Sequence, residues 1–198
     1  TWCTRRQLRA HLAALAGAGW QACTLARFEA RLQAPPGAAP PGREVLLTFD
    51  EGYSDFATHA WPELQAQHAP AVLFVVTGFA GRRSSWDLPL PGHRALHLGW
   101  PALRELAAAG LVIGSHAATH RDLRRLDDAA LGRELAGSRA SLEDALGLAV
   151  RALAYPFGRS DARVRAAAGA AGYTLGFSMC PRARAATPLE LPRSGVYI

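Results

Sequence analysis

The sequence predicts an α/β fold in which helices cover a parallel sheet. Short apolar runs alternate with helical patterns through most of the chain, which is the order of elements typical of a parallel sheet. The runs are apolar throughout instead of alternating with polar residues, so we expect both faces of the sheet to be buried. No Gly-rich dinucleotide-binding fingerprint follows any of these runs, and this favours a barrel over an open sheet.

Two helical patterns precede the first strand. Thr4 is a typical N-cap for a helix that runs to Ala18, where flanking glycines end the apolar spacing. Residues 24–33 show a second, shorter helical pattern. The Pro- and Gly-rich segment 34–42 predicts a loop and not an interdomain linker, because an apolar run follows it at once.

Strands and helices then alternate to the end of the chain. Buried strands are expected at residues 44–50, 71–76, 111–116, 151–157 and 174–179. Helices are expected at 54–67, at 101–109, from Asp127 or Asp128 to Gly147, and at 161–171. The segment 77–99 is irregular and long for a compact domain, which is typical of a lid or a binding loop.

The composition fits one folded domain. The 198 residues are 49% hydrophobic and 19% charged, which allows a full core and excludes an intrinsically disordered chain. No run of 18 apolar residues occurs, so no membrane-spanning segment is expected. We expect one domain over residues 1–198, in a mature or N-terminally truncated form, because neither an initiator Met nor a signal-peptide pattern opens the chain.

The net charge of +6 is not a sign of nucleic-acid binding. All 22 cationic residues are Arg and the chain contains no Asn, as GC-rich coding would produce. The arginines are scattered, without a basic stripe and interleaved aromatic residues, and nucleic-acid recognition would need such a stripe. We therefore expect no nucleic-acid partner.

The three cysteines have no metal-ligand spacing. Cys3 and Cys23 flank the first predicted helix and can pair in an oxidising compartment. The other interpretation is that these two and Cys180 are free, partly buried thiols.

Acidic and imidazole side chains follow several of the predicted strands. Asp50 and Glu51 end the first strand, and His116 ends another, with His120 four residues later. In barrels of alternating strands and helices, the carboxyl ends of the strands form the active site. We therefore expect these side chains to meet there.

Two imidazoles and one carboxylate are the ligands of a catalytic zinc site. One helical turn after the strand would place His116 and His120 on the same side, and one acid of the pair could bind the metal while the other accepts a proton. Loop histidines beside a solvated turn at Gly52 are the alternative, but the position of both motifs after buried strands favours a metal site.

The segment from Tyr155 to Gly158 closes a further predicted strand. Its functional interpretation is a backbone N–H that faces a developing oxyanion, which Phe157 can supply and Pro156 cannot. The alternative is a simple strand terminator. Trp86 and Trp100 near the irregular segment could present aromatic faces to a ligand or pack in the core.

Four motifs together resemble one known family. They are LLTFDEGYSDF (46–56), GSHAATHRDL (114–123), AYPFG (154–158) and LPRSGV (191–196), in this order and over nearly the whole chain. The chain is similar to the polysaccharide deacetylases, which are the NodB-homology or carbohydrate esterase family 4 proteins. The opening helices, Trp86-Asp87 and the LELPR ending most resemble the branch that acts on poly-N-acetylglucosamine exopolysaccharide.

This resemblance implies a distorted (β/α) barrel and a hydrolase that removes N-acetyl groups from an N-acetylglucosamine-containing polysaccharide. One divalent metal ion, most often Zn²⁺, would activate water to attack the amide carbonyl, with Asp50 as general base. The implied metal ligands are Glu51, His116 and His120. Phe157 would supply the oxyanion N–H, and Tyr155, Trp86 and Leu175 would contact the glycan or its acetyl group. The usual glycan substrates of the family imply an extracytoplasmic location.

Three positions depart from the family pattern. Glu51 stands where Asp is usual, and Ala154 replaces a usual Arg, so we expect Arg193 to orient Asp50 instead. No His follows His120, so the general acid is expected upstream of Thr1 or is absent. The internal alternatives, which we expect at the surface, are His11, His59, His93 and His97. A degenerate member that binds glycan without catalysis, and an esterase or amidase for another acyl group, are the alternative functions.

Overall fold

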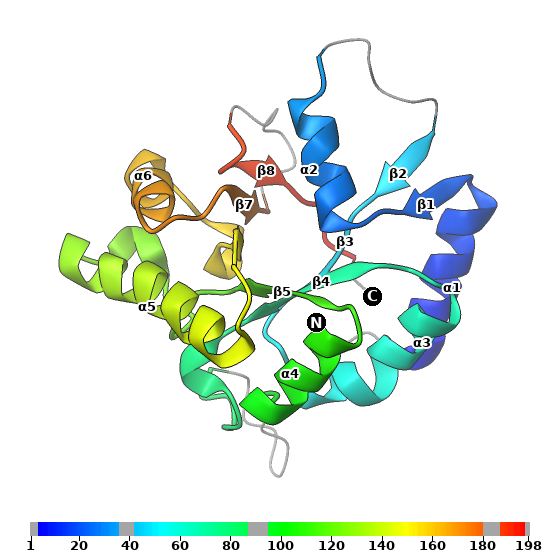
Figure 1. The fold of residues 1–198 in the computed structure, drawn as a ribbon, viewed down its shortest axis with the longest axis horizontal. Coiled ribbons are helices and arrows are strands. Elements are labelled where there is room, and N and C mark those ends of the chain that lie inside the picture. Colours follow the sequence, from blue (N-terminus) through cyan, green and yellow to red (C-terminus); the bar gives the residue numbers. More distant parts are fainter. Residues whose placement is uncertain (1–3, 36–41, 87–94, 180–186, 197–198) are drawn as a thin grey trace.

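The computed structural model describes residues 4–35, 42–86, 95–179 and 187–196, and its centre is one parallel sheet. Six strands follow each other in the sheet in chain order, and every neighbouring pair is parallel. They are β3 (Leu47–Phe49), β4 (Ala71–Val75), β5 (Val112–Ser115), β6 (Ala152–Ala154), β7 (Leu175–Ser178) and β8 (Leu191–Pro192). The sheet curls into a half-barrel (Figure 1), so the predicted α/β barrel class is confirmed.

A second, two-stranded sheet corrects the prediction for the first strand. Residues 44–50 do not form one strand, because β2 (Arg43–Val45) pairs with the unpredicted β1 (Trp20–Ala22) while β3 pairs with β4. The chain changes its pairing partner at Leu46, whose side chain packs against a buried cluster. An unbroken apolar run in the sequence gives no sign of this change of partner.

The helices begin at the residues that the sequence indicates. Thr4 caps α1 (Arg5–Gly17) and forms a capping box with Gln7, and Thr24 caps α2 (Leu25–Gln33). Of the two acids proposed as a cap for the long helix, Asp127 is the one that caps α5 (Asp128–Leu146). The remaining helices are α4 (Trp100–Ala108) and α6 (Ala162–Ala170).

The predicted helix 54–67 is not regular. A π-helical turn, Phe56–Ala60, precedes α3 (Trp61–Ala66), which has a proline in its first turn. Pro62 has no backbone N–H to donate to the carbonyl four residues earlier, at Thr58, so the α-helical bonding pattern is interrupted there.

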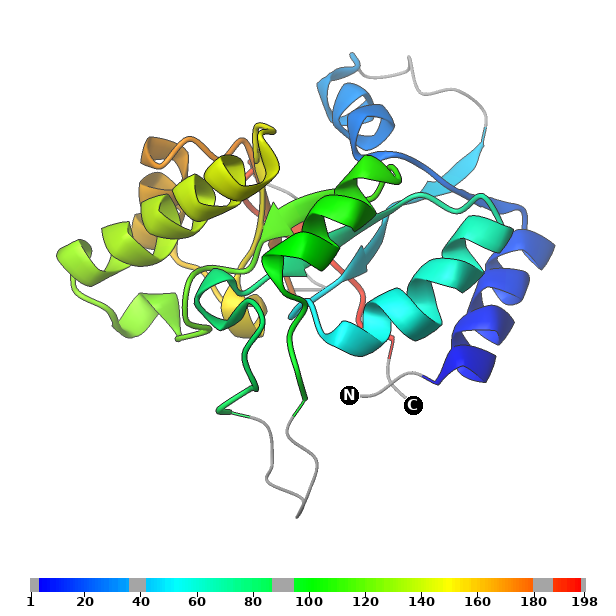
Figure 2. The same ribbon diagram turned by 60° about the horizontal axis from the view of Figure 1, so that its bottom comes forward.

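Two buried clusters lie on the two faces of the curled sheet. On one face, Val72 and Phe74 of β4 pack with Phe177 and with Leu25 of α2. On the other face, the alternate residues Leu73 and Val75 pack in a larger cluster with residues of the other helices. Figures 1 and 2 show α2 apart from α3, α4, α5 and α6, which surround the sheet.

The strands end earlier than predicted. β5 ends at Ser115 and β6 at Ala154, so His116 lies on a loop and Phe157 in a 3₁₀ turn (Pro156–Gly158), both just beyond the strands. In segment 77–99, a 3₁₀ turn (Thr77–Phe79) and a bridge between Arg83 and Leu96 are described. In the part of the chain that the structure describes, no helix is long and apolar enough to cross a membrane.

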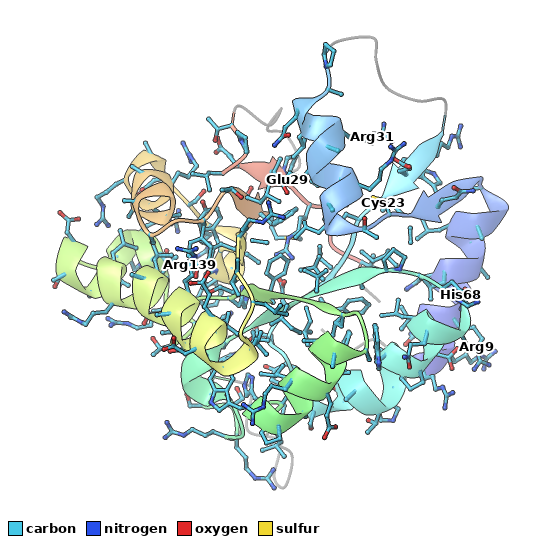
Figure 3. The ribbon with its side chains drawn as sticks, viewed as in Figure 1. Arg9, Cys23, Glu29, Arg31, His68 and Arg139 are labelled. Carbon is cyan, nitrogen blue, oxygen red and sulfur yellow. The ribbon has the colours of Figure 1, made fainter. Side chains whose placement is uncertain are left out.

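The cysteine prediction stays largely untested. Cys23 lies between β1 and α2 (Figure 3) and is buried as a free thiol. Cys3 and Cys180 lie outside the described residues, as do Asp87 and His93.

Candidate active site

Three metal-ligand side chains meet at the carboxyl ends of neighbouring strands. Glu51 follows β3, and His116 and His120 follow β5; one potential ligand atom from each lies within 4.8 Å of the other two. The Nε2 atoms of His120 and His116 are 3.0 Å and 3.8 Å from the same oxygen, Oε1 of Glu51. Both imidazoles are buried.

The protonation of His116 suits a ligand. Its Nδ1 is 2.7 Å from the carbonyl oxygen of Ala154, so Nδ1 carries the proton and donates it, which leaves a lone pair on Nε2. Burial lowers the pKa of His116, although the nearby charges of Asp50 and Glu51 act in the opposite direction. A neutral imidazole is the form that binds a metal ion.

The residues present fit a divalent cation. Glu51 Oε2 and His120 Nδ1 are buried and have no hydrogen-bond partner among the described residues. Buried polar atoms without partners are rare in folded proteins. Two imidazole nitrogens and a carboxylate, converging from two strand ends, are the donor set of a catalytic zinc site with an open position.

The loop between the two histidines is not the helical turn that the spacing predicted. Ala117 has φ 62° and His120 has φ 57°, and such left-handed conformations are strained for residues other than glycine. The loop, not helical periodicity, brings the two imidazoles together.

Glu134 of α5, which the sequence analysis missed, holds this loop in place. Its Oε2 accepts hydrogen bonds of 2.8 Å from the backbone N–H groups of both Ala118 and Thr119, and its Oε1 accepts one from the Thr119 hydroxyl. Its side chain is buried. A signal existed in the sequence: Glu134 falls at helical spacing within the apolar stripe of Leu131 and Leu135.

Arg193 makes a two-pronged contact with Asp50. Its Nη1 and Nη2 donate to Oδ1 and Oδ2 of Asp50 at 2.7 Å and 2.8 Å. Burial acts to raise the pKa of Asp50, but favourable electrostatic interactions with the neighbouring His116 imidazole and with the Arg193 guanidinium outweigh it, so the pKa lies below its usual value. The carboxylate is therefore ionised at neutral pH, which is the form that can accept a proton.

A tight turn aims Glu51 at the histidines. Glu51 and Gly52 have φ 74° and 72°, and a Cβ on Gly52 would approach Val75 Cγ2 to 3.2 Å. His97 Nδ1 donates to the Glu51 carbonyl at 2.9 Å. The expectation that His97 lies at the surface is wrong, because this contact buries it to 1% exposure.

The other proposed histidines lie elsewhere. His59 is exposed in the π-helical turn, with Nδ1 at 3.2 Å from the Asp55 carbonyl, and His11 is part-buried on α1. The structure identifies neither His59 nor His11 as the general acid.

Aromatic rings surround His120. The Trp86 ring stacks on it at 4.6 Å between centroids with an interplanar angle of 26°, and the Phe157 ring lies at 4.6 Å. Phe157 has φ 58° and is 53% exposed. Trp100 instead packs against the core at the start of α4.

Two of the proposed glycan contacts are not brought to the site. The Tyr155 side chain is fully buried, and its hydroxyl donates to the Leu189 carbonyl at 2.9 Å; burial raises its pKa. Leu175 is buried in the cluster that contains Val72 and Phe74, and it is the first residue of β7, at the opposite end of that strand from the histidine cluster. Both side chains have structural contacts, and neither reaches the histidine cluster.

Comparison with known proteins identifies relatives over most of the chain. A family profile described as "Polysaccharide deacetylase" matches residues 37–176. YxkH of Bacillus subtilis (strain 168), named for that family, is 28% identical over 179 residues, which cover 90% of this chain and 59% of YxkH. Poly-beta-1,6-N-acetyl-D-glucosamine N-deacetylase of Escherichia coli (strain K12) is 33% identical over 114 residues, or 55% of this chain and 16% of that protein.

Solved structures share the fold. IcaB from Ammonifex degensii superposes with a TM-score of 0.78 at 27% identity, over 98% of this chain and 84% of IcaB. The Streptococcus pyogenes deacetylase PplD, in complex with acetate, superposes with a TM-score of 0.81 at 23% identity, over 96% of this chain and 80% of PplD.

Proposed function

The chain belongs to the polysaccharide deacetylase family, and from this premise we propose that it is a metal-dependent hydrolase that removes N-acetyl groups from an N-acetylglucosamine-containing polysaccharide. One observation carries the proposal: the cluster of Glu51, His116 and His120 lies beside the Asp50–Arg193 ion pair. The choice of glycan is supported by the named substrate of the Escherichia coli relative.

The ligand roles follow from the geometry. Glu51, the Nε2 atom of His116 and one ring nitrogen of His120 would hold one divalent ion, and the nitrogen-rich donor set favours zinc. When bound, such an ion acts as a Lewis acid that polarises a carbonyl oxygen and lowers the pKa of water.

The remaining groups have separate tasks. Asp50 would accept the proton of the attacking water, and Arg193 would fix the orientation of its carboxylate. The Phe157 N–H would donate to the oxyanion that develops on the acetyl group. The exposed ring of Phe157 and the Trp86 ring would give apolar faces to sugar rings.

The location of the substrate sets the expected compartment. The usual glycan substrates of the family lie in the cell envelope or outside the cell, so we also propose an extracytoplasmic location.

The test is metal content together with acetate release. Purified wild type should hold about one zinc-like ion per chain, and Glu51→Ala and His116→Ala should each lose it. His59→Ala, which removes an exposed histidine, is the matched control and should retain the metal. The wild type should also release acetate from β-1,6-linked N-acetylglucosamine oligomers.

Glu51 in place of the usual Asp favours one competing function, glycan binding without turnover. If wild type holds no metal even after reconstitution but still binds the oligomers, the protein is a glycan-binding protein and not the proposed hydrolase. Metal retained in Glu51→Ala but lost in His116→Ala would remove Glu51 from the ligand set.

A further inference from the structure

A shallow cavity beside the proposed metal ligands has three arginines among its seven lining residues. Its volume is about 380 Å³, and its lining includes His120 and Phe157 together with Arg121, Arg125 and Arg159. Sites for small ligands commonly measure ~300–1,000 Å³. Because His120 and Phe157 belong to the candidate active site, a ligand in this cavity would be continuous with the reacting group.

The charge of the cavity is not balanced by its own lining. Asp122 is the acid in that lining, and Arg124 already holds its carboxylate through Nε at 3.0 Å and Nη2 at 2.8 Å. Arg159 Nη1 also donates to Asp122 Oδ2 at 3.5 Å, and Arg125 Nε lies 3.9 Å from the same oxygen, so one carboxylate faces three guanidinium groups.

The surplus guanidinium groups are available to a ligand. The Arg125 and Arg159 side chains are 83% and 54% exposed. Arg121 is exposed and forms no ion pair with any residue in the described ranges. Surface arginines of this kind present planar forks of N–H donors that match carboxylate and phosphate groups.

The backbone below these arginines is firmly held. Asp122 caps the 3₁₀ turn Leu123–Arg125, in which Leu123 is fully buried. Arg163 of α6 donates to the carbonyl of Leu126 at 2.9 Å. Arg121 and Arg125 therefore project from a fixed backbone segment, which reduces the entropy that a ligand must overcome.

We propose that this cavity is a subsite for an acidic substituent, a carboxylate or phosphate, on the sugar next to the N-acetylated sugar that is hydrolysed. This inference rests on the proposed function. The exposed Phe157 ring lies 4.6 Å from the His120 ring, centroid to centroid, and the Arg159 Cζ lies over it at 5.9 Å from its centroid, so a sugar that contacts Phe157 would have a substituent within reach of Arg159. The same charges repel the protonated amine that deacetylation produces, so the subsite disfavours stretches that are already deacetylated.

The experiment compares three trisaccharides of one linkage. Each contains N-acetylglucosamine next to a sugar that is neutral, carboxylated or phosphorylated. Acetate release gives kcat/KM for wild type and for two double variants. The cavity variant is Arg125→Gln/Arg159→Gln. The control variant is Arg6→Gln/Arg133→Gln, which removes two exposed charges outside the cavity. Wild type should prefer the acidic substrates over the neutral one, and the cavity variant should lose about tenfold of that preference. The control variant should keep the wild-type ratio of kcat/KM between the acidic and the neutral substrates. Added salt should reduce this ratio in wild type.

The outcomes separate the subsite from the proposed function. Equal kcat/KM values for all three substrates in wild type, or an acidic preference that survives in the cavity variant, would overturn the subsite and leave the hydrolase. Calorimetric binding of the acidic trisaccharides that weakens only in the cavity variant, without hydrolysis of any substrate, would support the subsite and overturn the hydrolase. A preference for the carboxylated or for the phosphorylated trisaccharide identifies which acid the subsite takes.

Discussion

At the scale of single residues, a substitution of Glu134 tests whether its hydrogen bonds to the loop between His116 and His120 are needed for metal binding. Glu134→Gln keeps the size of the side chain but removes its charge, so the two N–H groups lose a charged acceptor and the Thr119 hydroxyl must accept instead of donate. We expect zinc affinity to fall about tenfold, because groups that support metal ligands commonly matter by this amount. Competition with a chromophoric chelator gives the affinity.

Asp144→Asn is the matched control for Glu134→Gln. It makes the same change from acid to amide on the same helix, at an exposed position, and should leave zinc affinity unchanged. Equal affinity in Glu134→Gln and wild type would show that the loop keeps its shape without this carboxylate.

A second prediction at the residue scale concerns how replacement of Arg193 changes the pH dependence of activity. Its hydrogen bond lowers the pKa of Asp50, so Arg193→Ala should raise that pKa. The acid limb of the pH profile of kcat/KM should then move to higher pH, and kcat should fall because Asp50 loses its orientation. Arg193→Lys should restore only part of the rate, because lysine cannot make the two-pronged contact. An unchanged profile and rate in Arg193→Ala would exclude the positioning role.

The residues that meet at the site were predictable to different degrees. Asp50, Glu51, His116 and His120 could be placed together because each follows an apolar run, and strand ends converge in barrels. The position of His97 at the site could not be predicted, because its burial depends on a contact between segments that are 46 residues apart. Tyr155 was assigned to the ligand because its motif adjoins the site, whereas its side chain points into the protein.

At the scale of elements, Glu63 joins α3 to α1. Arg5 and Arg9 of α1 both donate to its carboxylate, with Arg9 bonds of 2.9 Å and 2.7 Å, and Arg9 lies at the outer edge of the molecule in Figure 3. The hydrogen bond from Arg9, the largest cause, lowers the pKa of Glu63 to about 2. The folded state thus binds this proton less readily than the unfolded state.

This shift predicts how stability depends on pH. The contribution of Glu63 is fully present above the ordinary Glu pKa of about 4.3 and is lost as the pH falls toward 2. Glu63→Gln should therefore be less stable than wild type at pH 7 and should lose less stability between pH 4.5 and pH 2. Urea unfolding at several pH values gives both quantities. Glu105→Gln on the exposed side of α4 is the control, and an equal slope in Glu63→Gln and wild type would contradict the shift.

Element boundaries show what a single sequence cannot reveal. Helix starts were predictable, because N-capping by Thr4, Thr24, Asp127 and Asp161 depends on local hydrogen bonds. The division of the run 44–50 between two sheets was not, because it depends on which distant strand each half meets. Pro62 did give a local sign of the irregular helix, which the prediction of an unbroken helix over 54–67 overlooked.

At the scale of the whole molecule, the site joins the two edges of the sheet. β3 and β8 are the first and last strands, and no ladder joins them in the described part of the chain. Asp50 directly follows β3 and Arg193 directly follows β8, and Arg193 also donates to Thr48 of β3 at 3.2 Å. The ion pair therefore links the carboxyl ends of the two edge strands across the gap, so one contact serves both the shape of the half-barrel and the orientation of the proposed base.

Metal binding should stabilise the whole fold, because the proposed ligands come from β3 and β5 and lie beside that link. A ligand that binds only the folded state adds about 2.7 kcal/mol at a concentration of 100 Kd, which corresponds to a Tm increase of about 5–10 °C for a chain of this length. Zinc should raise the Tm of chelator-treated wild type by this amount in a thermal scan, and His120→Ala should abolish the increase. His68→Ala, which removes a histidine outside the cluster, should retain it. The same increase in His120→Ala as in wild type would mean that zinc stabilises the protein at another place.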